Sequence, residues 1–173
     1  VRTRLTGASL EETSFAINQN SIVHVAGIGI YDHNILNAGG VLTQGVAVAG
    51  SSATINDNFV SDAGATGILA LNQVSGVGAT LSQVLTIDPN TVIQAREAGI
   101  AVWTNAYRGG LAVQTLGIDG NTVALVQPLL VDAVGIGVRN TAGQGSSSGT
   151  ISQTLAITGN SVATIGPLGG GLR

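Results

Sequence analysis

Three adjacent residues carry side chains that could move protons: Tyr31, Asp32 and His33. A histidine next to a carboxylate can act as a general base, and a tyrosine can donate or accept a proton in the same reaction. Such chemistry also needs a second acid or base nearby. The internal repeat described below brings no second acid or base beside His33, so we predict no catalytic residues. An enzymatic role is left as the less favoured interpretation.

The remaining acidic residues are scattered along the chain without pairing. They are Glu11, Glu12, Asp57, Asp62, Asp88, Glu97, Asp119 and Asp132. We expect the carboxylates nearest to turns, including Asp57, Asp88 and Asp119, to accept local backbone N–H groups. The chain has no cysteine, which excludes disulfides and thiolate metal sites. We therefore predict no metal site and no cofactor.

The chain contains an internal repeat with three marks in a fixed order. The first is a Gly-Ile pair that opens an apolar strand, as at Gly27, Gly67, Gly99 and Gly135. The second is a glutamine followed by alternating apolar residues. The third is an asparagine three residues after the last of these apolar positions. The five asparagines are Asn20, Asn58, Asn90, Asn121 and Asn160.

The spacing of the marks indicates a solenoid. Successive asparagines are 38, 32, 31 and 39 residues apart, which is typical of strands of constant length joined by variable loops. The distance from glutamine to asparagine is 7 residues in three coils but 14 between Gln44 and Asn58. One coil therefore carries a seven-residue insertion, which we place between Ala49 and Thr54.

Each repeat contains three short apolar runs rich in Val, Ile and Thr and bounded by Gly, Asn and Asp, which favours strands over helices. The sequence predicts an all-β fold, a right-handed parallel β-helix of about five coils with three short strands per coil. We expect this solenoid over residues 13–166. Residues 1–12 are interpreted as an N-terminal arm or cap, and residues 167–173 as a Gly-rich tail.

The repeated asparagines have a structural explanation. The corner after each glutamine strand needs a residue that tolerates left-handed backbone angles, and asparagine accepts them better than most. Stacked asparagines can also hydrogen-bond along the rod. We predict a structural ladder of the five asparagines.

Strand alternation also predicts a column of exposed side chains. If Ile30 points inward, the next residue along the strand points outward, and the repeat places one residue of each later coil beside it. The candidate interaction column is Tyr31, Leu71, Trp103 and Arg139. Three interpretations of this column are open. It binds sugar rings, it contacts another subunit, or the loops that follow the strands cover it.

Composition restricts the partners. Only 9% of the residues are charged, compared with roughly a quarter in an average domain, and the mean hydropathy is +0.42. The net charge of -3 gives no electrostatic footprint for nucleic acid or for an anionic membrane surface. No apolar run is long enough to span a membrane. We expect no nucleic-acid partner and no membrane span.

The order of strand, asparagine corner, strand and Gly-Ile strand resembles the right-handed parallel β-helix superfamily, which includes pectate lyases, alginate epimerases, phage tailspikes and bacterial surface proteins. The segment Tyr31-Asp32-His33 also resembles part of an alginate epimerase signature. The rest of that signature, with its glycine, proline and second acid, is absent. The resemblance implies a fold more than an activity.

Two functions follow as expectations. The first is a non-catalytic structural or adhesive β-helix that self-associates into a fibre, sheath or surface assembly, since low surface charge and uncapped solenoid ends favour association. The alternative is a carbohydrate-binding or carbohydrate-active β-helix that acts on a polysaccharide. The resemblance implies an extracellular or cell-surface location for either.

Overall fold

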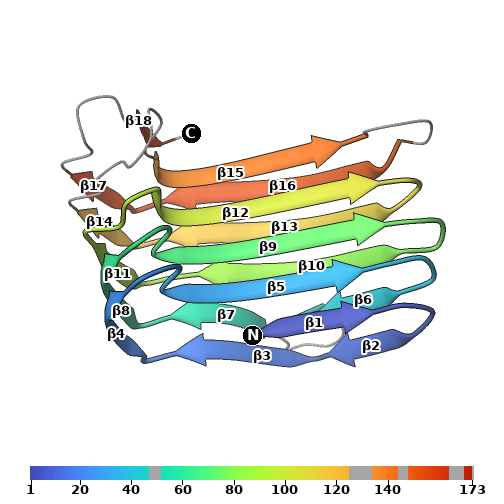
Figure 1. Ribbon diagram of the computed structural model, residues 1–173, viewed down its shortest axis with the longest axis horizontal. Coiled ribbons are helices and arrows are strands. Elements are labelled where there is room, and N and C mark those ends of the chain that lie inside the picture. The colour runs from blue at the N-terminus through green and yellow to red at the C-terminus, as the bar shows by residue number, and fades with distance from the viewer. Residues whose placement is uncertain (47–51, 125–133, 144–147, 164–169, 173) are drawn as a thin grey trace.

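The computed structural model describes residues 1–46, 52–124, 134–143, 148–163 and 170–172. All regular structure in these residues is β-strand, and the strands form three sheets around a common core (Figure 1). Neighbouring strands within each sheet run parallel. This confirms the predicted all-β parallel solenoid with three strands in each coil.

Each coil contributes to the sheets in the order A, B, C. Sheet A contains β1 (Arg2–Leu5), β5 (Ile30–Leu36), β9 (Ile68–Ser75), β12 (Ala98–Tyr107), β15 (Val134–Ala142) and β18 (Gly170–Leu172). Sheet B contains β2 (Ser9–Glu12), β3 (Ser14–Asn18), β6 (Val41–Gln44), β7 (Ser52–Asn56), β10 (Thr80–Ile87), β13 (Leu111–Asp119) and β16 (Thr150–Thr158). Sheet C contains β4 (Ser21–Val25), β8 (Asn58–Ala63), β11 (Asn90–Ile93), β14 (Thr122–Ala124) and β17 (Ser161–Ala163).

The solenoid has about four turns, slightly fewer than the five coils expected. The reason is visible in sheet C, where the strand order is β4-β8-β11-β14-β17. Its five strands correspond to the five asparagine marks, and five successive marks enclose four full turns.

The two chain ends also contribute strands. Residues 1–12, which were interpreted as an arm or cap, include β1 and β2, and these strands pair in parallel with β5 and β6. Within the expected tail, β18 pairs with the first residues of β15. Residues 167–169 and 173 of that tail lie outside the described residues.

The core is formed by the inward-facing residues of the alternating strands. Most of it is one large apolar cluster that includes Ile55, Ile87 and Ile118, all fully buried in sheet B. The repeated Gly-Ile pair is explained by crowding at the corner that leads into sheet A. A Cβ on Gly99 would lie 2.3 Å from Val123 Cγ1 and 2.6 Å from the Gly135 carbonyl oxygen, so only glycine fits.

A layer of polar side chains crosses the core beside the large apolar cluster. On sheet B, Gln83 donates to Gln44, Gln114 donates to Gln83, and Gln153 donates to Gln114, each through its side-chain amide. Residues of sheet A complete these contacts, as Thr104 does by donating to Gln114 Oε1 at 2.7 Å. Buried polar groups need such partners, since an unpaired one is costly in the interior.

The five repeated asparagines lie in register at the corner between sheets B and C. Asn58, Asn90 and Asn121 are buried, and each donates its amide to the next asparagine and to an isoleucine carbonyl. None of the five asparagines has the left-handed angle expected of it. In four coils the preceding residue has it instead, with φ of 58° at Gln19, 53° at Asp57, 63° at Gly120 and 62° at Gly159, whereas Asn90 follows Pro89. The expectation was wrong because the asparagine side chain must point inward, which leaves the turn to its neighbour.

The seven-residue insertion begins earlier than predicted. β6 ends at Gln44, and Gly45 turns the chain out of sheet B with a φ of 68°. Val46 precedes the predicted insertion, which would leave it in the strand, but it is exposed. The strand resumes at β7, where Ala53 pairs with Leu85. Residues 47–51 lie outside the described residues.

Candidate interaction surfaces

The outer face of sheet A carries the predicted column with one change of register. Leu71 pairs with Trp103, and Trp103 pairs with Arg139, as expected. The residue of β5 opposite Leu71 is His33, whereas Tyr31 pairs with Leu69. The column is therefore His33, Leu71, Trp103 and Arg139, preceded by Arg2 of β1. Tyr31 lies in the adjacent column of the same face.

The change has a structural cause at the first Gly-Ile pair. A Cβ on Gly29 would collide with Val60 and with the Gly67 carbonyl oxygen, as a Cβ on Gly67 would collide with the next coil. Gly29 is thus the crowded glycine of its coil, and the equivalent pair is Gly29-Ile30 instead of Gly27-Ile28. The two pairs are two residues apart and share strand faces, so alternation does not distinguish them.

The strand separates the three residues that could move protons. Tyr31 and His33 lie on the outer face, where the tyrosine hydroxyl and His33 Nδ1 are 2.9 Å apart and the rings stack at 5.1 Å. His33 Nε2 lies 3.0 Å from Gln73 Oε1. Asp32 points into the core and is 1% exposed. The carboxylate therefore does not pair with the imidazole.

Asp32 occupies an unusual place for an acid. In the later coils its position is taken by Ala70, Val102 and Val138. Neither of its carboxylate oxygens has a hydrogen-bond partner among the described residues. Burial raises its pKa to about 6, while the amino group of Val1 acts in the opposite direction and the charge of Glu12 in the same direction. The carboxyl group takes up a proton more readily here than in water.

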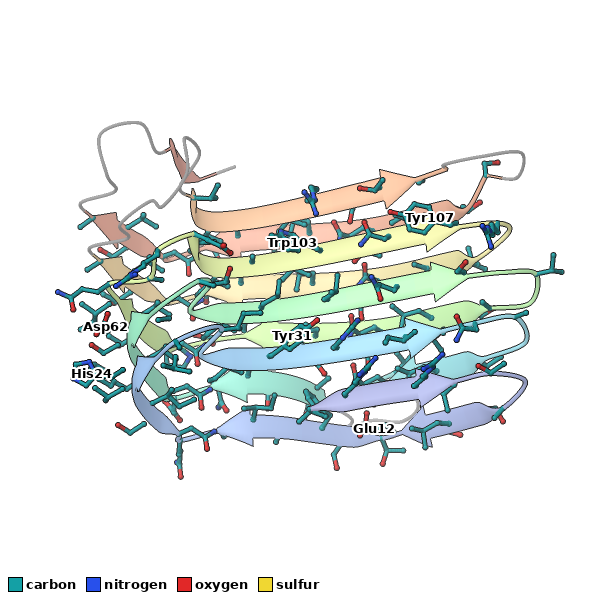
Figure 2. The ribbon with its side chains drawn as sticks, viewed as in Figure 1. Glu12, His24, Tyr31, Asp62, Trp103 and Tyr107 are labelled. Atoms are coloured by element: carbon teal, nitrogen blue, oxygen red, sulfur yellow. The ribbon has the colours of Figure 1, made fainter. Side chains whose placement is uncertain are left out.

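Trp103 packs within its own column. The guanidinium carbon of Arg139 lies 4.5 Å from the centre of the indole ring, a cation–π contact. Trp103, Leu71 and Tyr31 also pack against a small apolar cluster around Leu69 on this outer face. Figure 2 shows Tyr31 and Trp103 on sheet A. Because Arg139 covers one face of the indole, that face is not free to stack on a sugar ring.

One polar pair was missed by the sequence analysis. His24 Nδ1 lies 2.7 Å from Asp62 Oδ2 at an exposed corner (Figure 2). Both residues have positive φ, 56° and 52°. The signal was present, because each follows its ladder asparagine, Asn20 or Asn58, by four residues. The repeat register therefore places them in adjacent coils.

The corner between sheets B and C also brings acids together. Burial raises the pKa of Asp88, with smaller contributions from the charges of Asp119 and Asp57. Asp119 Oδ1 accepts a hydrogen bond of 2.7 Å from the Thr158 hydroxyl. These acids were expected to accept backbone N–H groups at the turns, and no such bond to their carboxylates is present among the described residues. Asp57 instead adopts the left-handed angle of its turn, with a φ of 53°.

The two ends of the solenoid expose residues of the core. We call the end formed by β1, β2, β3 and β4 the N-terminal end, and the end formed by β15, β16 and β17 the C-terminal end. Leu155 is equivalent to the buried Leu116, yet it is 43% exposed because no coil lies above it among the described residues. Leu10, equivalent to the buried Leu42, is 39% exposed at the N-terminal end.

The polar ladders end on complementary atoms. Within the solenoid, the backbone N–H of each ladder asparagine donates to Oδ1 of the next one, as Asn121 does to Asn160 at 2.9 Å. At the C-terminal end the backbone N–H of Asn160 is left without such a partner in the described chain. At the N-terminal end Asn20 donates to Asn58, and its own Oδ1 accepts nothing from the described residues.

Among the described residues, only the first part of β15 pairs with a further strand. β18 pairs with Val134 and Ile136. The register carried through sheet A makes Arg2 equivalent to Arg139, and Leu5 equivalent to Ala142. The β1 strand of a second copy would therefore pair with 139–142, beyond the part of β15 that β18 uses.

The described residues hold no cluster of three or more His, Cys, Asp or Glu side chains that could bind a metal ion. They also hold no helix of the length and apolar character needed to cross a membrane. Comparison with known proteins gives no relative, because no family model, no curated protein and no solved structure matches the chain.

Proposed function

We propose that the protein is a structural module that associates head to tail, with the N-terminal end of one copy stacked on the C-terminal end of the next. Repetition of this contact builds a fibre, sheath or surface assembly. The observation that carries the proposal is the equivalence of the two ends. Each presents exposed core residues and ladder atoms at positions that occupy successive coils inside the solenoid.

The apolar contacts of such a junction follow from the register. Phe15 of β3 is equivalent to Leu155 of β16, and Ile17 is equivalent to Ile157. In the stack, Phe15 of one copy covers Leu155 of the other. Phe15 is 7% exposed and Leu155 43%, so the apolar surface that this contact buries, at about 25 cal/mol for each Å², comes mainly from Leu155.

The backbone supports the same direction of stacking. Edge strands with unpaired N–H and C=O groups are templates for another strand. β2, β3 and β4 are edge strands at the N-terminal end, and β16 and β17 are edge strands at the C-terminal end of the described chain. Parallel pairing of these strands continues the solenoid, whereas two identical ends would meet with antiparallel strands. A location outside the cell or on its surface is part of the proposal and rests on the resemblance to β-helix surface proteins.

The experiment blocks one end at a time. Leu155→Asp places a charge at the C-terminal end, and Leu10→Asp places one at the N-terminal end. Both side chains are substantially exposed, so both variants are expected to fold. Thr154→Asp is the matched control, because Thr154 is adjacent to Leu155 but points away from the core.

Sedimentation velocity gives the result. We expect the unmodified chain and Thr154→Asp to form long oligomers, and each end variant to stay monomeric alone. A mixture of the two end variants is expected to form dimers, because each retains the end that the other needs. A strictly monomeric unmodified chain, or end variants that assemble like it, would refute the proposal.

A further inference from the structure

Glu12 occupies the first position of the buried glutamine ladder. It pairs in register with Gln44, and Gln44 Nε2 donates to Glu12 Oε2 at 2.8 Å. The register continues through Gln83 and Gln114 to Gln153. A carboxylate thus takes the place of an amide at the N-terminal end of the solenoid (Figure 2).

The ladder has a direction. Each glutamine donates its side-chain N–H toward the N-terminal end and accepts through Oε1 from the coil that follows. Two of the ladder oxygens accept two hydrogen bonds each. Gln83 Oε1 accepts from Asn72 at 3.2 Å and from Gln114 at 2.7 Å, and Gln114 Oε1 accepts from Thr104 and Gln153. Gln153 Oε1 accepts one, from Asn140 at 2.9 Å, and its second donor would come from the next coil.

In the head-to-tail stack that next residue is Glu12 of the second copy. An ionised carboxylate only accepts hydrogen bonds, so two acceptor oxygens face each other in a contact closed to water. A protonated Glu12 has one O–H, which can donate to Gln153 Oε1 and complete the ladder. We propose that Glu12 limits head-to-tail association of this chain and couples each junction to the uptake of one proton.

The side chains that Glu12 meets along the ladder are uncharged. Its ladder neighbour Gln44 on β6 is neutral, and so are Gln153 and Asn140, which it would meet across the junction. The charge of Glu12 raises the pKa of Asp32 on β5, and the amino group of Val1 lowers it. Glu11, the preceding residue, points outward and is exposed.

This inference rests on the proposed function, and one set of variants tests both. Glu12→Gln restores the missing donor and keeps the oxygen that accepts from Gln44. Glu11→Gln is the matched control, since it removes the same charge one residue away on the opposite face. Asp32→Asn, alone and combined with Glu12→Gln, removes Asp32 as a source of pH dependence. Thermal unfolding checks that all variants fold.

The association constant is measured by sedimentation at pH 7.5, where carboxyl groups are generally ionised, and at about pH 4, where an appreciable share of carboxyl groups is protonated. At pH 7.5 we expect Glu12→Gln to associate at least about tenfold more tightly than the unmodified chain, the equivalent of one recovered buried hydrogen bond. Glu11→Gln is expected to match the unmodified chain. The advantage of Glu12→Gln should shrink at the lower pH, with or without Asp32→Asn.

Two results would overturn the inference. If the chains assemble but Glu12→Gln does not differ from the unmodified chain at pH 7.5, Glu12 does not limit the junction, and the proposed function stands without it. If none of the proteins assembles at either pH, the head-to-tail proposal fails, and the role of Glu12 fails with it.

Discussion

Asn90 donates two hydrogen bonds to a single atom of Asn121, one from its backbone N–H at 2.8 Å and one from its side-chain amide at 2.9 Å. The second amide hydrogen of Asn90 bonds the Ile55 carbonyl of the preceding coil at 2.7 Å. One side chain therefore ties three coils together at a corner where the backbone groups would otherwise lack partners.

Replacing Asn90 by alanine is expected to lower the free energy of unfolding by about 3 kcal/mol, because several buried donors and acceptors lose their partners. Urea denaturation measures the change. Asn20→Ala is the comparison, since Asn20 is exposed at the end of the ladder. It should cost about 1 kcal/mol or less. Equal losses of unfolding free energy at the two sites would contradict the prediction that burial makes the hydrogen bonds of Asn90 more costly to remove than those of Asn20.

Asp32 makes stability depend on pH. Its pKa is about 6 in the folded chain, compared with an ordinary value of 3.8. Between these values the folded state binds more protons than the unfolded state, so stability falls as the pH rises. Because one pKa unit corresponds to about 1.4 kcal/mol, the buried charge costs about 3 kcal/mol above pH 6 and nothing below pH 3.8.

Asp32→Asn removes this dependence. We expect its advantage in unfolding free energy over the unmodified chain to grow by about 3 kcal/mol between pH 3.5 and pH 7.5. Asp32→Ala, which copies Ala70 of the next coil, should show the same growth. Chemical denaturation across this range decides the matter, and an advantage that stays constant with pH would contradict the burial of the charge.

Gly99 is a position where added volume cannot be absorbed. Gly99→Ala would drive a methyl group against Val123 and the Gly135 carbonyl oxygen. We expect a loss of about 2 to 3 kcal/mol in unfolding free energy, since overpacking forces neighbouring backbone to shift. Gly27→Ala is the control, because a Cβ there meets nothing within 4 Å. Calorimetry should show a lower melting temperature for the first variant alone.

The sequence predicted the solenoid because its repeats fix both the strand period and the stacking. It missed the register of Tyr31, since a shift of two residues preserves strand alternation. The asparagines could have corrected this, because Gly29, Gly67 and Gly99 each follow a ladder asparagine by nine residues. The inward turn of Asp32 follows from the same alternation, but its burial depends on the coil stacked against it.

The site was harder to predict than the fold. The residues with positive φ at the ladder corner include Gln19, Asp57 and Gly120, which share no chemistry that a pattern could reveal. The role of Glu12 depends on its alignment with Gln44, and the insertion in that coil together with the uneven loops hides this alignment. The direction of the hydrogen bonds along the ladder is set only in the folded chain, so the spacing of residues in the sequence does not predict it.

The tryptophan fluorescence of the chain comes from Trp103 alone, because it is the only tryptophan in the sequence. Its emission therefore measures the surroundings of the column on sheet A. Arg139→Gln removes the guanidinium that covers one face of the indole. We expect a stability loss of about 0.5 to 1 kcal/mol, as for a partly exposed cation–π contact. The fluorescence emission of Trp103 should shift to longer wavelength because water reaches the uncovered ring. Acrylamide should also quench this fluorescence more strongly.

The control for this experiment is Arg96→Gln, which removes an exposed arginine outside the strands of sheet A. It should leave the emission and the quenching of Trp103 unchanged. If Arg139→Gln also leaves quenching unchanged, a surface other than Arg139 shields the indole, and the outer face of sheet A is covered in solution.

Head-to-tail association adds a further test, because Arg2 is equivalent to Arg139 and would lie directly beyond it in the stack. In that case quenching of Trp103 should fall as protein concentration rises, and the fall should be lost in Leu155→Asp.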